Sequence, residues 1–266
     1  MPTAAQLNYV RTGPRGHAPV VLLHSAGLDL TYWDEQITDL TRRHDVIALD
    51  LPGHGRSIAQ PESITITQMS AAVTTALAAL QCGPVHLVGL SVGGLIAQQI
   101  ALTDPQLIAS LALLDTAARF APAGQASMRK RAAVVREQGM DAILDGLFGH
   151  WLLPETRERR PDLIDRATKT LLHDDACVHA ALWETIADFD DADRLGSIAA
   201  PTLVLVGEHD SSSPISSSQE LRAGIPNAQL QVIANAAHLS PIEQPATVTG
   251  HLDAFLRSLT TIGVNL

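Results

Sequence analysis

Residues 85–102 decide the fold of this chain of 266 residues, and they read Val-His-Leu-Val-Gly-Leu-Ser-Val-Gly-Gly-Leu-Ile-Ala-Gln-Gln-Ile-Ala-Leu. An apolar run leads into Gly89-Leu90-Ser91-Val92-Gly93, and helical periodicity follows from Leu95. The pattern predicts a strand, a tight turn with Ser91 at its tip, and a helix. Glycine two positions on either side of the serine lets neighbouring backbone approach closely. We therefore expect the serine hydroxyl at a helix N-terminus, where backbone N–H groups favour negative charge.

Five further apolar runs resemble the one before Ser91, and segments with helical periodicity lie between most of them. Buried strands that alternate with helices form a parallel sheet covered on both faces. We therefore expect an α/β fold with a mostly parallel, doubly wound sheet, in which ligands bind at the carboxyl ends of the strands. The expected strands are residues 20–23, 45–49, 85–88, 108–114, 202–206 and 229–233, and the expected core helices are residues 69–80, 95–102, 217–223 and 245–259.

The connection between the fourth and fifth expected strands is far longer than a simple crossover needs. It has helical periodicity and contains two of the three tryptophans. We expect a core domain made of residues 1–115 and 200–266, with a helical lid inserted at 116–199 over the carboxyl edge of the sheet. The aromatic side chains of the lid are expected to form either a pocket wall or the interior of the lid itself, and they are Phe120, Phe148, Trp151 and Trp183.

The composition narrows the partners and the compartment. The chain has 18 Lys+Arg against 28 Asp+Glu, a formal net charge of −10, which argues against nucleic acid and anionic membrane surfaces as partners. Aromatic residues make up 3%, too few for base-stacking platforms. Two cysteines make no disulfide framework, and the first residues have no apolar stretch that suits a signal peptide or membrane span. We expect a cytoplasmic protein that acts on a small molecule, with homo-oligomerisation left open.

Ser91 needs partners if it is to act as a nucleophile. A serine needs a neighbouring base, and the base needs an acid that orients it. His238 and Asp210 each follow an expected strand, so we expect Ser91, Asp210 and His238 to form a catalytic triad. Asp115 also closes a strand and is the alternative acid, and Glu208 lies two residues from Asp210. Because the base must be neutral, activity should fall below a pH of roughly 6 to 7.

Acyl transfer also needs hydrogen-bond donors for the negative charge that develops on the carbonyl oxygen. We expect one from the N–H of Val92, directly after the nucleophile. The second is expected from the N–H of Ala26, in the loop that follows the first expected strand. His24 and Ser25 of the same loop are candidates for contact with the substrate.

One cluster, His173-Asp174-Asp175-Cys177-His179, could be mistaken for a metal site. On a helix, residues six positions apart point to different faces, so His173 and His179 diverge. We expect a solvated helix there, and we expect the protein to use no metal and no cofactor.

Several motifs together resemble the α/β-hydrolase superfamily over the whole chain, and the order Ser91, Asp210, His238 is the order found in that superfamily. Residues 29–36, 115–119 and 236–245 further resemble 3-oxoadipate enol-lactone hydrolases and related esterases. The resemblance implies cofactor-free hydrolysis of a carboxylic ester or lactone. The motifs are His24-Ser25-Ala26-Gly27, Asp50-Leu51-Pro52-Gly53-His54-Gly55-Arg56-Ser57, Gly89-Leu90-Ser91-Val92-Gly93-Gly94, Gly207-Glu208-His209-Asp210 and Ala237-His238-Leu239-Ser240.

The chain departs from the lactone hydrolases in two places. It has His24-Ser25 where they usually have Asn-Ser. It also has Pro52 in the turn where they tend to carry the sequence Asp-x-Arg-Gly-His-Gly. Arg119 is a candidate partner for a substrate carboxylate, with an exposed hinge arginine as the alternative. Because a net charge of −10 repels anions at long range, we expect a neutral ester or lactone ahead of an anionic one.

Other activities on the same residues stay open. C–C bond hydrolysis, perhydrolysis and hydroxynitrile cleavage use the same triad in the resembled superfamily. A ligand-binding protein on a hydrolase scaffold is a further alternative.

Overall fold

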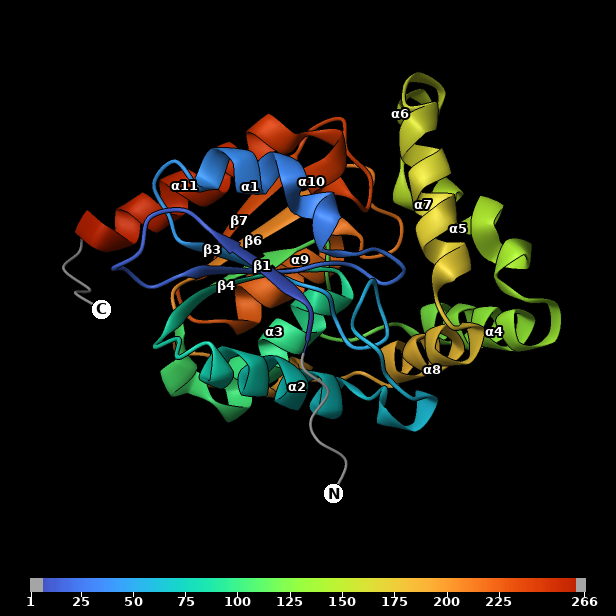
Figure 1. The fold of residues 1–266 in the computed structure, drawn as a ribbon, viewed down its shortest axis with the longest axis horizontal. Helices are drawn as coiled ribbons and strands as arrows, with labels where there is room; N and C mark the ends of the chain where they lie inside the picture. Colours follow the sequence, from blue (N-terminus) through green and yellow to red (C-terminus); the bar gives the residue numbers. More distant parts are fainter. Residues whose placement is uncertain (1–6, 262–266) are drawn as a thin grey trace.

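The computed structural model describes residues 7–261, which fold around one seven-stranded sheet with the strand order β1-β3-β2-β4-β5-β6-β7 (Figure 1). β1 pairs with β3 in the antiparallel sense, and every other neighbouring pair is parallel. The prediction of a mostly parallel sheet is therefore confirmed. The strands are β1 (Tyr9–Thr12), β2 (Val20–Leu23), β3 (Val46–Leu49), β4 (Val85–Leu90), β5 (Ile108–Leu114), β6 (Thr202–Gly207) and β7 (Gln229–Ile233).

The sequence did not reveal β1. Every residue of β2, β3 and β5 is buried, which explains their continuous apolar runs. β1 lies at the edge of the sheet and its four residues are exposed or half-buried, so it has no comparable run.

Helices cover both faces of the sheet (Figure 1). One face carries α1 (Asp34–Leu40) and α11 (Pro245–Thr261), which contact each other, with the short α10 (Ser240–Glu243) before α11. The other face carries α2 (Ile66–Ala79), α3 (Val92–Thr103) and α9 (Ile215–Gly224). No helix within residues 7–261 is long and apolar enough to cross a membrane.

Five further helices lie between β5 and β6, beside one end of the sheet in Figure 1. We call residues 122–187 the helical insertion. Within it α4 packs along α8, and Arg136 of α4 pairs with Glu184 of α8. The insertion is joined to the loops after β7, because the N–H of Leu239 donates to the carbonyl oxygen of Trp151 at 3.1 Å. Its helices are α4 (Pro122–Gln138), α5 (Leu144–Trp151), α6 (Pro154–Arg159), α7 (Pro161–His173) and α8 (Ala176–Ala187).

The expectation of a solvated helix at residues 173–179 is wrong for His179, which is 1% exposed. Asp175 ends the preceding turn and caps α8 by accepting from the N–H groups of Cys177 and Val178. This cap turns the next residues inward, and the ring of His179 packs edge-on against Trp183 with 5.9 Å between ring centroids. Burial lowers the pKa of His179 to about 3, so it stays neutral.

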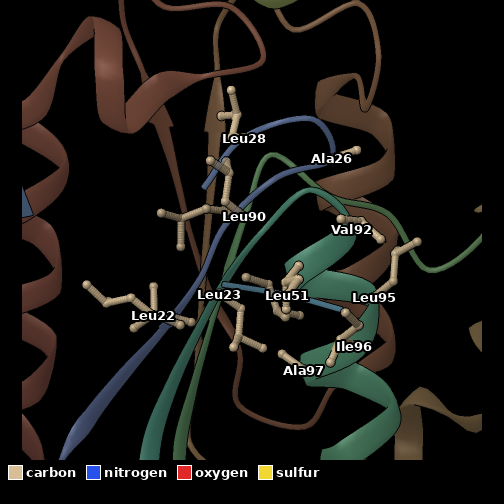
Figure 2. Packing of buried hydrophobic residues seen from close by; sticks show 14 of the residues in the cluster. Leu22, Leu23, Ala26, Leu28, Leu51, Leu90, Val92, Leu95, Ile96 and Ala97 are labelled. Carbon is tan, nitrogen blue, oxygen red and sulfur yellow. The ribbon is translucent and has the colours of Figure 1, made fainter. Parts of the chain in front are cut away.

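The apolar core reaches the turn that contains Ser91 (Figure 2). Leu23 of β2, Leu90 of β4 and Ile96 of α3 are each at most 2% exposed. A fully buried leucine or isoleucine contributes about 1.5–3 kcal/mol relative to an exposed one. The strand and the helix on either side of Ser91 are therefore both held firmly by the core.

Candidate active site

Ser91 lies in the sharp turn between β4 and α3, with φ 54° and ψ −117°. This conformation is unfavourable for a residue with a side chain. The turn is possible because two glycines let backbone segments touch. A Cβ on Gly89 would lie 2.3 Å from the carbonyl oxygen of Gly93, and a Cβ on Gly93 would lie 2.4 Å from that of Leu23. The N–H of Ser91 donates to the Leu114 carbonyl oxygen at 2.9 Å, which joins the turn to β5.

The structure brings Ser91, His238 and Asp210 together from three separate loops. The Ser91 Oγ lies 2.9 Å from His238 Nε2, and His238 Nδ1 lies 2.9 Å from Asp210 Oδ2. The other carboxylate oxygen of Asp210 accepts from the N–H groups of Ser212 and Ser213 at 2.8 and 2.9 Å. Because Asp210 holds the proton of Nδ1, the Nε2 atom is left to accept the serine hydroxyl proton.

The alternative acid, Asp115, has a different position. Its two carboxylate oxygens accept from the N–H groups of Gly207 at 2.8 Å and Ser240 at 3.0 Å, and it makes no hydrogen bond to His238. These two hydrogen bonds connect Gly207, which precedes the loop that contains Asp210, to Ser240, which lies two residues after His238. Burial, followed by the nearby Asp210 carboxylate, raises the pKa of Asp115 above its usual value.

The charges around His238 favour its protonated form. Burial by itself lowers the pKa of this histidine. The attraction and hydrogen bond of Asp210, together with Asp115, outweigh burial, so the pKa of His238 is raised above its usual value. The arrangement can therefore stabilise an imidazolium that forms when the serine loses its proton.

Two backbone N–H groups lie near Ser91 without an acceptor. Val92 begins α3 and Ala26 lies in the loop after β2, and Figure 2 shows both near the N-terminal end of that helix. Both residues are at most 2% exposed, and neither N–H donates a hydrogen bond to any residue in the described range 7–261. Buried N–H groups without a partner are rare, which marks these two as donors available to a ligand.

The structure does not bring His24 or Ser25 to the cavity beside Ser91. His24 Nε2 accepts from the N–H of Leu51 at 2.9 Å, and its Nδ1 lies 2.8 Å from the Ser25 carbonyl oxygen. Both ring nitrogens are thus occupied, and burial lowers the pKa of His24 to about 4. The histidine joins the Ala26 loop to the loop after β3. A long-range hydrogen bond to backbone leaves no mark in the sequence, so this role was missed.

A cavity of about 110 Å³ lies between Ser91, His238 and the helical insertion. Phe120, Trp151 and Trp183 line it and Phe148 does not, so the lid aromatics divide between the two roles that the sequence left open. Arg119 does not line it, because its half-exposed guanidinium pairs with Glu220 at 2.5 Å. Sequence reasoning missed Arg131, which lies on α4 at helical spacing from other lining residues and could have been found by that spacing. The lining residues of α4 are Gly124, Ser127, Met128 and Arg131.

Comparison with known proteins points to one family. Residues 18–245 match the family described as alpha/beta hydrolase fold. The chain is 29% identical over 251 residues to 3-oxoadipate enol-lactonase 2 of Acinetobacter baylyi, covering 94% of this chain and 93% of the relative. The crystal structure of the enol-lactonase from Burkholderia xenovorans LB400 superposes with a TM-score of 0.88 at 31% identity, covering 94% and 96% of the two chains. A malate-bound thermophilic esterase from Thermogutta terrifontis gives a TM-score of 0.88 at 32% identity, covering 95% and 93%.

Proposed function

Because the chain belongs to the alpha/beta hydrolase fold family, we propose that it is a serine hydrolase that cleaves a small carboxylic ester or lactone through an acyl-enzyme. The observation that carries the proposal is the hydrogen-bonded chain from Ser91 through His238 to Asp210, of which Ser91 and His238 line a cavity. Similarity to proteins described as enol-lactonases and an esterase supports an ester or lactone bond as the target.

In the first half of the reaction, His238 Nε2 takes the hydroxyl proton while Ser91 Oγ bonds to the carbonyl carbon of the substrate. The carbonyl oxygen becomes an oxyanion and accepts hydrogen bonds from the N–H groups of Val92 and Ala26. His238 then gives its proton to the leaving oxygen as the C–O bond breaks. For a lactone the leaving hydroxyl stays attached to the acyl group.

In the second half, water attacks the acyl-enzyme. His238 accepts a proton from the water while the water oxygen bonds to the acyl carbon. His238 then returns a proton to Ser91 Oγ as the bond between Oγ and the acyl carbon breaks and the carboxylic acid leaves. Asp210 keeps the imidazole in one tautomer and stabilises its charged form in both halves.

The helical insertion acts in this proposal as the lid that sets substrate size. Phe120 and Trp151 give the cavity apolar walls, and a volume of about 110 Å³ suits a small acyl group better than a polymer. The chain therefore divides functionally into the core that holds the triad and the insertion that shapes the pocket.

The test is steady-state and pre-steady-state hydrolysis of p-nitrophenyl butyrate by the wild-type protein and by Ser91→Ala. We expect a burst of p-nitrophenol from the wild type and a loss of kcat of at least about 1,000-fold in the variant. Wild-type turnover in Ser91→Ala would refute the proposal. If esters are untouched but diketones are cleaved by the wild type, C–C bond hydrolysis replaces ester hydrolysis as the reaction.

A further inference from the structure

Arg131 is the feature of the cavity that the proposed reaction does not use. Its side chain comes from α4 and lines the same cavity as Ser91 and His238. Among the residues that line this cavity it is the one side chain with a permanent charge, and none of the lining residues is acidic. The cavity lining therefore contains a positive group together with the proposed nucleophile.

The guanidinium of Arg131 has no polar partner among the residues that the structure describes. It stacks on Trp183, with 4.2 Å from the guanidinium carbon to the ring centroid. Across residues 7–261, no carboxylate lies within ion-pair distance and no acceptor is hydrogen-bonded to it. The side chain is half-buried, and burial lowers its pKa. A desolvated charge without a partner is costly, so its donors are available to a ligand.

The neighbouring cations on the same helix behave differently. Arg129 and Arg136 are exposed, and they pair with Asp188, the residue that follows α8, and with Glu184 of α8, respectively. These pairs join two helices at the surface, a role that Arg131 does not share. Lys130 is also exposed and does not line the cavity.

We propose that Arg131 binds a carboxylate of the substrate, so that the site selects esters or lactones that carry a negative charge. The inference rests on the proposed function and adds the substrate class. A guanidinium presents a planar fork of N–H donors that matches a carboxylate. Trp183 holds that fork in place by stacking, which reduces the side-chain freedom lost on binding.

This inference reverses the preference drawn from composition. A net charge of −10 repels anions at long range, but salt at physiological ionic strength screens exposed charges beyond about 8 Å. Arg131 acts inside a partly desolvated cavity at contact distance, where screening is weaker. Local charge at the site therefore decides which substrate binds, and Arg131 takes the role for which Arg119 was one candidate in the sequence.

The experiment compares two esters with acyl chains of equal carbon number, mono-p-nitrophenyl glutarate and p-nitrophenyl pentanoate. Arg131→Gln should lower kcat/KM for the glutarate ester about 10- to 100-fold, mainly through KM, and should change the neutral ester less than about 3-fold. Arg131→Lys should restore part of the loss. Lys130→Gln is the matched control, because it removes the same charge from the next position of the helix, and it should leave both esters unchanged.

A carboxylate on the leaving group is tested with 3-acetoxybenzoate against phenyl acetate, and a selective loss in either pair supports the proposal. Three results would overturn the proposal. Arg131→Gln could lower kcat/KM equally for charged and neutral esters in both pairs, it could lower kcat/KM in neither pair, or Lys130→Gln could have the same effect. The unchanged neutral ester also shows that Arg131→Gln is folded.

Binding without turnover separates this inference from the proposed reaction. Glutarate should bind to Ser91→Ala in calorimetry, and the double variant Ser91→Ala/Arg131→Gln should bind it at least about 10-fold more weakly. If Ser91→Ala keeps full activity while glutarate binding still depends on Arg131, the reaction assignment fails and the carboxylate site stands. If glutarate binding is the same in both, the carboxylate site fails.

Discussion

In the proposed reaction, the proton affinity of His238 sets the pH at which hydrolysis can occur. His238 must be neutral to accept the Ser91 proton. The structure surrounds it with two carboxylates, of which Asp210 is hydrogen-bonded to it and Asp115 is further away. Arg131 works against them by lowering the pKa of His238, as burial does.

The pH dependence of hydrolysis follows from this balance. Because the carboxylates win and the pKa of His238 is raised, kcat/KM for p-nitrophenyl butyrate should fall as the pH drops through a value above 6.5. This is at or above the upper part of the range expected from the sequence. Arg131→Gln should move the midpoint further up, and Lys130→Gln should leave it in place. A wild-type midpoint at or below 6.5 would contradict this account of the site.

The hydrogen-bonded group of Ser91, His238 and Asp210 could be expected from the sequence because each of these residues follows an apolar run that had to become a strand. The choice between Asp210 and Asp115 could not be made that way, since both close strands. The structure distinguishes them by their hydrogen bonds, with Asp210 on His238 and Asp115 on two backbone N–H groups. Arg119 could not be set aside from the sequence, because its pairing with Glu220 is a contact between distant segments, whereas the helical spacing of Arg131 from the other lining residues of α4 was present in the sequence.

At the scale of elements, the strand, turn and helix around Ser91 depend on close backbone packing. Gly93→Ala places a Cβ 2.4 Å from the carbonyl oxygen of Leu23, so α3 must move away from β2. We expect the free energy of unfolding to fall by about 1–3 kcal/mol in urea titration. The hydrolysis rate should fall as well, because the Val92 N–H moves with the helix.

Gly250→Ala is the matched control for that substitution. Gly250 lies within α11, is exposed, and has open space where a Cβ would be placed. An alanine there should raise the free energy of unfolding by about 0.5–1 kcal/mol and leave the rate unchanged. A Gly93→Ala protein as stable and active as Gly250→Ala would show that the turn does not need the close approach.

Most elements of the core could be predicted from apolar runs and helical periodicity, but their ends could not. β4 extends two residues beyond the expected end, because Gly89 and Leu90 still pair with Leu113 and Leu114 of β5. The sequence suggested a turn there, since glycine usually ends a strand. Long-range strand pairing overrides that local signal.

At the scale of the whole molecule, the acidic surface and the cationic cavity have different roles. The net charge of −10 repels anions such as nucleic acid at long range. It does not describe the cavity, whose lining contains Arg131 and no acidic residue. The net charge therefore predicts how the protein attracts or repels charged molecules at long range. In the proposed function, the choice of substrate depends on the cavity-lining side chains of the helical insertion.

The most direct test of the central claim is to treat the protein with a fluorophosphonate and locate the adduct by peptide mass spectrometry. The hydrogen-bonded chain from Ser91 to Asp210 predicts one adduct, on Ser91, that is absent from Ser91→Ala and forms far more slowly in His238→Ala. An unmodified wild-type protein, or an adduct that persists in Ser91→Ala, would contradict the assignment of Ser91 as the nucleophile.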